Sequence, residues 1–252
     1  INLLELLLGP KARLRLALVV MVIALVLTRS RTGNTALFIS LLLTGGLFVL
    51  IEKQHRLRNS LILGSIILID VLIISQYFGL EQLKDRLVNT QLRDVVVEGV
   101  VVQKSTEDRP DVFAYALPLL LEKPLTGQGA GSFEAVFPQY PGADIRAHFD
   151  HAHNDYLEFG IEYGLLGSLP LAAFILLALW HALRALWQRQ SVYRSGVGFG
   201  ASMGIIALLI HSGTDFNLQI PANAATLIVL CAIAVLAGSH RHAHKRHTSP
   251  AL

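Results

Sequence analysis

The feature that most constrains this chain is its series of apolar blocks, each roughly 17–25 residues long and separated by polar links. A block of that length crosses a bilayer as one helix, because a helix satisfies its own backbone hydrogen bonds in lipid. Hydrophobic residues make up 53% of the chain and charged residues only 15%, which is too little charge for a soluble surface. We therefore expect an all-α polytopic membrane protein.

Six blocks are apolar enough to predict transmembrane helices, at about residues 14–28, 35–51, 60–78, 165–187, 197–210 and 222–238. They divide the chain into helices 1–3 in residues 1–78, a large loop in 79–160, helices 4–6 in 161–238, and a basic tail in 239–252. The single cysteine, Cys231, excludes an intrachain disulfide. The chain opens at Ile1 rather than methionine, and we expect an N-terminal part to be missing.

The positions of Lys and Arg predict the orientation. With the N-terminal segment inside, every inside segment carries three of them, as the positive-inside bias requires: Lys11, Arg13 and Arg15; Lys53, Arg56 and Arg58; Arg184, Arg189 and Arg194; Arg241, Lys245 and Arg246. The links 29–34 and 211–221 and the loop 79–160 then face outside. The tail lies inside, where its basic residues face anionic lipid.

The outer loop is predicted to be partly helical. Residues 79–92 have helical apolar spacing, whereas VVVEGVVV at 95–102 fits either a strand or buried packing. Residues 107–123 predict a helix with Pro110 in its first turn and a break or kink near Pro118. The glycine-rich segment 124–133 is more typical of a simple turn than of an anion-binding backbone.

Cationic and titratable side chains gather on the predicted outer face. Arginine offers planar paired donors that suit phosphate, and histidine titrates near neutral pH and can move a proton. Such a set suits a lipid-linked anionic substrate. The candidates are Arg29, Arg31, Arg109, Arg146, His151, His153, Asn154, His211 and Asp215.

Six of these candidates also have a structural explanation. Arg29 and Arg31 fit interfacial anchoring, His151 and His153 fit surface histidines with Asp150 capping the next helix, and His211 with Asp215 fits a local pair. Asp70, inside the third span, fits an interhelical contact. Metal ligation by His148, Asp150, His151 and His153 is disfavoured, because His151 and His153 are two residues apart and diverge on a helix.

The stretch HNDYLEFGIEYGLLG at 153–167 resembles the signature of the O-antigen ligase family, through His153, Asn154, Gly164 and Gly167. Three further stretches resemble the same family in the same order: SRTG at 30–33, DRPDVFAYALPLLLEKPLTGQGAGSF at 108–133 and HSGTDFNLQIPANA at 211–224. The four ordered motifs together are specific, and the resemblance extends over about residues 15–238. Phe113 stands where the family often has Trp.

The resemblance implies a GT-C-like membrane glycosyltransferase of the bacterial inner membrane with its active site facing the periplasm. It implies transfer of a glycan from an undecaprenyl-diphosphate carrier to a sugar hydroxyl of the lipid A core, with no metal, other cofactor or nucleic acid. By motif, Arg31 and Arg109 bind the diphosphate and His153 is the general base, while Asn154 orients the histidine or binds sugar. Family members have about a dozen spans, so this chain resembles the C-terminal half.

Alternatives remain open from the sequence. The motifs do not separate the ligase from a polysaccharide polymerase or a protein O-oligosaccharyltransferase, because these enzymes differ only in the acceptor. A polysaccharide transporter predicts charged residues inside the spans, where only Asp70 is clearly found. A half that is inactive without the missing helices is a further alternative.

Overall fold

The fold comes from a computed structural model, which describes residues 9–28, 30–78, 95–97, 100–103, 109–140, 148–189 and 191–239. The prediction of a helix over 79–92 lies outside these residues, as does the basic tail from residue 240 on. All six predicted spans are helices: α2 (Pro10–Leu27), α3 (Arg31–Ile51), α4 (Arg56–Phe78), α8 (Asp155–Gln188), α9 (Val192–Ser212) and α10 (Pro221–Ser239).

Four helices in the described part are long and apolar enough to cross a membrane: Thr32–Ile51, Asp155–Gln188, Val192–Ser212 and Pro221–Ser239. In α2 a shorter apolar helix covers Leu16–Leu25. The side chains of residues 69–71 and 73–78 in α4 lie outside the described set, and with them the interpretation of Asp70. The prediction of an all-α polytopic membrane protein is therefore confirmed.

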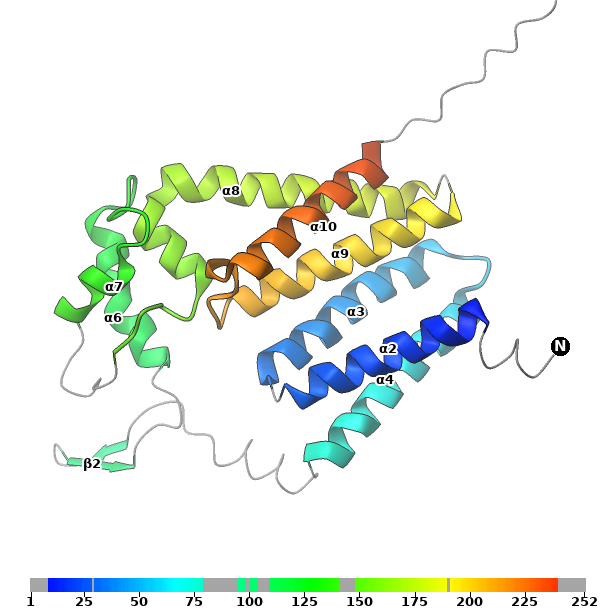
Figure 1. The fold of residues 1–252 in the computed structure, drawn as a ribbon, viewed down its shortest axis with the longest axis horizontal. Helices are drawn as coiled ribbons and strands as arrows, with labels where there is room; N and C mark the ends of the chain where they lie inside the picture. The colour runs from blue at the N-terminus through cyan, green and yellow to red at the C-terminus, as the bar shows by residue number, and fades with distance from the viewer. Residues whose placement is uncertain are drawn as a thin grey trace, which may run out of the picture.

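The helices pack into one bundle, in which α8, α9 and α10 contact one another and α3 lies against α9, with α2 and α4 beside α3 (Figure 1). Small residues form much of the contact between α8, α9 and α10, including Ala182, Ala201, Cys231 and Ala234. Leucines such as Leu176 and Leu236 are exposed. Close contact through small residues with large apolar side chains outside is the packing expected of helices in lipid.

The bundle has two distinct ends, because consecutive helices run in opposite directions. At one end α3 and α8 begin and α9 ends, and Thr214 Oγ1 of the link after α9 lies 3.0 Å from Thr32 Oγ1 in the first turn of α3. At the other end Arg189, directly after α8, pairs with Glu52, directly after α3. The links near residues 30 and 214 thus share one end, in agreement with the predicted alternation.

Between α4 and α8 the described residues form a small hairpin and a helical unit. Strands β1 (Val95–Val97) and β2 (Val100–Gln103) pair antiparallel, which decides the open choice for 95–102 in favour of strands. Helix α6 (Arg109–Glu122) is followed by the short helix α7 (Phe133–Val136) and the 3-10 turn η1 (Phe137–Gln139). These helical segments lie beside the start of α8 (Figure 1).

Helix α6 runs through Pro118 without a break, so the structure excludes the break from the predicted break or kink. A proline inside a helix removes one hydrogen bond and crowds the preceding turn. Here the flanking Ala116 and Leu119 are buried in a cluster with Phe133, Phe137 and other apolar residues. Burial of that face outweighs the lost bond, and Pro118 itself is exposed.

Candidate active site

His153 stands directly before α8 in a strained backbone conformation. Its φ of 51° is in the left-handed region, which costs a residue with a side chain about 1–3 kcal/mol. Asn154 follows as the N-cap of α8, and its side-chain oxygen accepts a hydrogen bond from the Leu157 amide at 3.2 Å. The sharp turn at His153 therefore ends in a capped helix, and this fixes the position of the imidazole.

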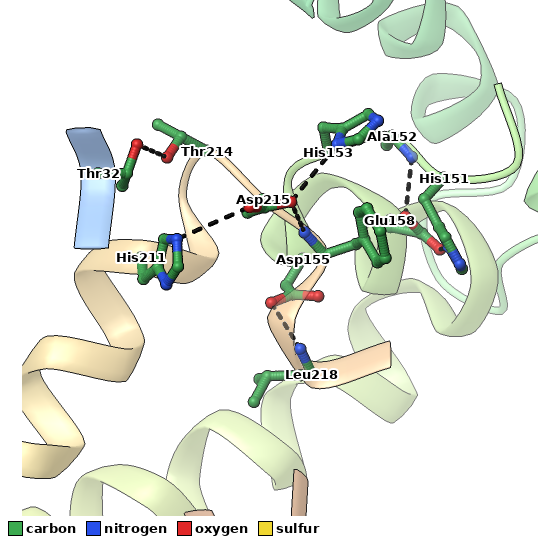
Figure 2. Close-up of polar contacts among 11 residues, drawn as sticks. Thr32, His151, Ala152, His153, Asp155, Glu158, His211, Thr214, Asp215 and Leu218 are labelled. Atoms are coloured by element: carbon green, nitrogen blue, oxygen red, sulfur yellow. Dashed lines mark hydrogen bonds and ion pairs between the residues drawn. The ribbon is translucent and has the colours of Figure 1, made fainter. Parts of the chain in front are cut away.

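Asp215 lies between two histidines that are far apart in the sequence (Figure 2). Its Oδ1 is 3.4 Å from Nδ1 of His153 and its Oδ2 is 3.7 Å from Nε2 of His211. The amide of Phe216 donates to Oδ1 at 3.0 Å, which orients the carboxylate. The local pair of His211 and Asp215 is thus present, and it also reaches His153. With Nδ1 facing a carboxylate, Nε2 is the nitrogen of His153 left for a substrate.

His151 forms a second, tighter contact with a carboxylate. Its Nδ1 lies 2.7 Å from Oε1 of Glu158, while the Ala152 amide donates to Oε2 at 2.8 Å. The ring of His151 stacks on Phe216 with 4.5 Å between centroids. The same Phe216 meets His153 edge-on at 5.0 Å. The link after α9 therefore places one phenyl ring against both histidines.

Three buried acids at the start of α8 were missed by the sequence reasoning. Asp155, Glu158 and Glu162 are almost fully buried, and their spacing puts them on one face of the helix. Asp155 accepts a hydrogen bond from the Leu218 amide at 3.0 Å, which fastens the 211–219 link to α8. This spacing just before a long apolar run was the available signal, and charged residues are rarely fully buried without partners.

Helix α8 is interrupted at Gly164, whose φ of 59° and ψ of −169° are not helical. In an unbroken helix the amides of Leu165 and Leu166 would bond the carbonyls of Ile161 and Glu162. Here the two amides bond the carbonyls of Pro124 and Leu125 at 2.9 and 3.0 Å instead. We call this exchange, together with the bonds that the loop donates to the carbonyls of Ile161 and Glu162, the Gly164 latch.

The other half of the latch satisfies the freed carbonyls. Gln128 N donates to Ile161 O at 2.7 Å and Gly129 N donates to Glu162 O at 3.0 Å. A Cβ at Gly127 would lie 2.3 Å from the Glu162 carbonyl oxygen, and one at Gly164 would lie 2.4 Å from the Leu125 oxygen. The glycine-rich segment thus donates its amides to α8, in agreement with the interpretation as a turn rather than an anion site.

Side chains strengthen the same connection between the loop and α8. The Phe133 amide donates to the buried Glu162 carboxylate at 3.3 Å. Gln128 Nε2 donates to Glu122 at 3.0 Å, and the Tyr140 hydroxyl also donates to Glu122. That bond raises the pKa of the Tyr140 phenol above its ordinary value. The helical unit of the loop is therefore held against the part of α8 that follows His153.

The arginines lie at helix starts. Arg31 is the first residue of α3, with Ser30 as its N-cap, and the neighbouring Thr32 contacts Thr214 of the link that carries Asp215. Arg109 is the first residue of α6, and Val112, one turn on, packs in the same cluster as Ala152. The described structure thus brings both backbones toward the histidines. Neither side chain is in the described set, and Arg29 and Arg146 lie outside it entirely.

Two further expectations can be compared with the structure. Asp150 is not the cap of the helix after it, because the chain turns at His153 and Asn154 takes that role. The histidines considered for metal ligation face three different carboxylates: His148 contacts Glu134, His151 contacts Glu158 and His153 contacts Asp215. No cluster of three or more metal-ligating side chains occurs among the described residues.

A comparison with protein families found one match. The O-antigen ligase family model matches residues 16–172, which is more than half of the 252 residues. The matched range includes Arg31, Arg109 and His153, whereas His211 and Asp215 lie beyond it. A comparison with curated proteins found no match.

Proposed function

The chain belongs to the O-antigen ligase family, and on that premise we propose that it transfers a glycan from undecaprenyl diphosphate to a sugar hydroxyl of the lipid A core. Membership in the family supports glycan transfer by a membrane enzyme. The donor, the acceptor and the residue roles are our proposal.

The observation that carries the proposal is the position of His153. Its Nδ1 faces Asp215 at 3.4 Å, at the end of the bundle where α3 starts with Arg31. A carboxylate at Nδ1 fixes the tautomer that leaves Nε2 able to accept a proton, and stabilises the imidazolium that results. Transfer from a diphosphate carrier needs a base for the acceptor hydroxyl close to cations for the diphosphate. His153 would be the base, and the helix starts at this end carry the arginines.

The reaction then has one bond-forming step. The acceptor hydroxyl oxygen attacks the anomeric carbon of the donor sugar as its proton passes to Nε2 of His153. The bond from that carbon to the phosphate oxygen breaks, and undecaprenyl diphosphate leaves with the electron pair. Positioned proton transfer of this kind contributes about 10²–10⁴-fold to the rate.

The leaving diphosphate needs positive charge around it rather than a strong acid. We assign that role to Arg31 and Arg109, since a guanidinium binds phosphate oxygens through two parallel hydrogen bonds. Arg29, Arg146 and His211 are assigned to substrate binding around them. With charge supplied by arginines, transfer is expected to proceed at an unchanged rate in the presence of a metal chelator.

The base assignment is tested with the protein in liposomes supplied with lipid-linked glycan and lipid A core. His153→Ala should lower transfer about 10²–10⁴-fold while the protein stays folded in the membrane. His148→Ala is the matched control, because His148 is exposed and contacts only the exposed Glu134 among described residues. Full activity of the His153 variant would contradict the assignment.

The arginine assignment is tested by charge-conserving changes. Arg31→Lys and Arg109→Lys should each weaken transfer, because lysine keeps the charge but cannot bind phosphate through two parallel bonds. Arg58→Lys, an exposed residue at the start of α4, should behave like the parent. Near-normal transfer by both site variants would favour membrane anchoring instead.

The acceptor is tested in cells. Mass spectrometry of lipopolysaccharide, periplasmic glycoproteins and secreted polysaccharide is compared between the parent strain and one lacking the gene. Loss of long glycans on the lipid A core alone supports the ligase. Loss from glycoproteins or from secreted polysaccharide instead identifies a protein O-oligosaccharyltransferase or a polymerase.

We further propose that the site faces the periplasm from the inner membrane, with the loop 79–160 covering it. In a Cys231→Ser background, Glu134→Cys should react with a membrane-impermeant maleimide on spheroplasts. Lys53→Cys, at the other end of the bundle, should react only after the membrane is opened. The reverse pattern would invert the orientation.

A further inference from the structure

His151 and Glu158 form a pair that the proposed reaction does not use. Oε1 of Glu158 is 2.7 Å from His151 Nδ1, and its Oε2 accepts from the Ala152 amide. The Glu158 side chain is 1% exposed and that of His151 is 29% exposed. One nitrogen of His151 is therefore fixed inside the protein, while Nε2 contacts no other described polar group.

The surroundings of the pair are acidic. Glu158 lies on one face of α8 with the buried Asp155 and Glu162, and Asp215 faces the same region from the link after α9. Among the described side chains, His151 is the basic group that contacts one of the three α8 acids, Glu158. A buried carboxylate is stable when a charged partner with a short hydrogen bond compensates it. His151 can be that partner when it is protonated, through its Nδ1 contact with Glu158.

The two histidines differ in how closely they contact their carboxylates. The contact of His151 is short and its carboxylate is buried, so the attraction is weakly screened. The contact of His153 is 3.4 Å long, and Asp215 is 32% exposed. His151 is therefore held more closely by its carboxylate than His153 is.

Phe216 joins the two histidines into one site. Its ring stacks on His151 at 4.5 Å and meets His153 edge-on at 5.0 Å between centroids. The two imidazole rings therefore lie against the same phenyl ring, so that a substrate bound at His153 lies next to the Phe216–His151 stack. The part of the donor closest to the reacting carbon is its diphosphate.

We propose that His151, held as an imidazolium by Glu158, donates an Nε2–H hydrogen bond to the donor diphosphate, with Glu158 as its positioning residue. This inference rests on the proposed function and deepens it. No proton is transferred in this role, because the diphosphate leaves as an anion. His153 accepts the proton of the hydroxyl, and His151 keeps its own.

The test measures binding and transfer separately. Binding of undecaprenyl diphosphate to the full protein in detergent micelles is measured between about pH 5.5 and pH 9, around the range in which histidine titrates. Transfer is measured over the same range at varied donor and acceptor concentrations. The variants are His151→Gln and Glu158→Gln. The matched controls are His148→Gln and Glu134→Gln, an exposed pair with a similar 2.9 Å contact.

Diphosphate binding by the parent should weaken as pH rises and His151 loses its proton. His151→Gln should raise the donor KM about tenfold at neutral pH and remove this pH dependence, because glutamine keeps a contact to Glu158 without the charge. Glu158→Gln should move the loss of binding to lower pH. The acceptor KM and both control variants should not change. Thermal unfolding of each variant checks the fold.

Two results would overturn the inference. Parent-like binding and donor KM in His151→Gln would remove His151 from the diphosphate site while leaving the proposed function intact. A rise in the acceptor KM alone would assign His151 to the other substrate. If His151-dependent binding is found but no glycan transfer, the proposed function fails and the diphosphate site stands.

Discussion

The two ends of the bundle use polar side chains in opposite ways. At the end where α3 and α8 finish, which we call the arginine end, charges meet complementary partners. Arg189 pairs with Glu52, Arg194 Nε donates to the Ala237 carbonyl at 2.9 Å, and Arg56 donates to the Leu50 carbonyl at 3.1 Å. The last two cations lie at helix C-termini, where free carbonyls and the helix dipole favour them.

At the histidine end, where α3 and α8 begin, several buried polar groups lack hydrogen-bond partners. His153 has a left-handed backbone, as Arg189 does at the arginine end. Within the described structure, buried side-chain nitrogens of His211, Asn217 and Gln219 have no hydrogen-bond partner, against His181 Nδ1 at the arginine end. Such features reduce stability and are typical of functional sites. The difference teaches that ion pairs fasten the bundle at the arginine end, whereas more buried nitrogens stay unpaired at the histidine end, where we propose the substrate binds.

The largest effect is expected where the histidine end joins the loop. Gly164→Ala would place a Cβ 2.4 Å from a backbone oxygen at a positive φ, so the Gly164 latch must open. We expect a loss of about 3 kcal/mol or more of stability and loss of transfer, measured by thermal unfolding in detergent and by the liposome assay.

The control for this change is Gly200→Ala, a helical position in α9 with no atom within 4 Å of the added Cβ. It should leave stability the same or slightly higher. A stable, active Gly164 variant would show that the latch does not support the histidine end.

The second prediction concerns the carboxylate shared by two histidines. Asp215→Asn removes the charge that stabilises the His153 imidazolium, so kcat should fall about tenfold or more, equivalent to about 1.4 kcal/mol. Donor and acceptor KM should change little, and thermal unfolding should remain close to the parent. An unchanged kcat would mean that the 3.4 Å contact does not assist the base.

The third prediction separates capping from sugar binding at Asn154. Asn154→Ala should destabilise the protein by about 1 kcal/mol, since the Leu157 amide loses its cap. Asn154→Ser restores a capping oxygen and should restore stability. If activity returns together with stability, Asn154 acts as a cap; if stability returns without activity, the amide also binds substrate.

The smallest effect on activity is expected at the arginine end. Glu52→Gln removes the partner charge of Arg189, but that arginine remains partly exposed to solvent. We expect a loss of about 1 kcal/mol or less and transfer at the parental rate, by the same two measurements. Strong loss of transfer would show that the salt bridge at the arginine end affects the histidine end.

The six helices and the family resemblance were readable from the sequence because both depend on local order. Apolar block length alone decides whether a helix can span a bilayer, and all six predicted spans are helices. The signature at 153–167 identified His153 and the two glycines. The start of α8 was predicted less accurately, at about residue 165, whereas the helix begins at Asp155. Its first turns contain polar residues, which a hydropathy pattern does not assign to a membrane span.

The candidate site could be predicted only in part. His153, Asp215 and His211 were singled out as residue types, but their contact joins segments that are 62 positions apart. The contacts of Glu158 and Phe216 with the histidines were not visible at all, because each depends on which side chain packs opposite. Helix α6 continues through Pro118, and the burial of its Ala116 and Leu119 face was likewise not visible in the sequence.

The sequence by itself thus determined the number of apolar helices, the alternation of their ends and the chemical types available at each end. Only the tertiary structure decided that Gly164 interrupts α8, that residues 124–129 take up the freed hydrogen bonds, and which histidine faces which acid. The physical reason is that hydrophobic length acts along the chain, whereas hydrogen bonds between distant segments exist only after packing has brought them together.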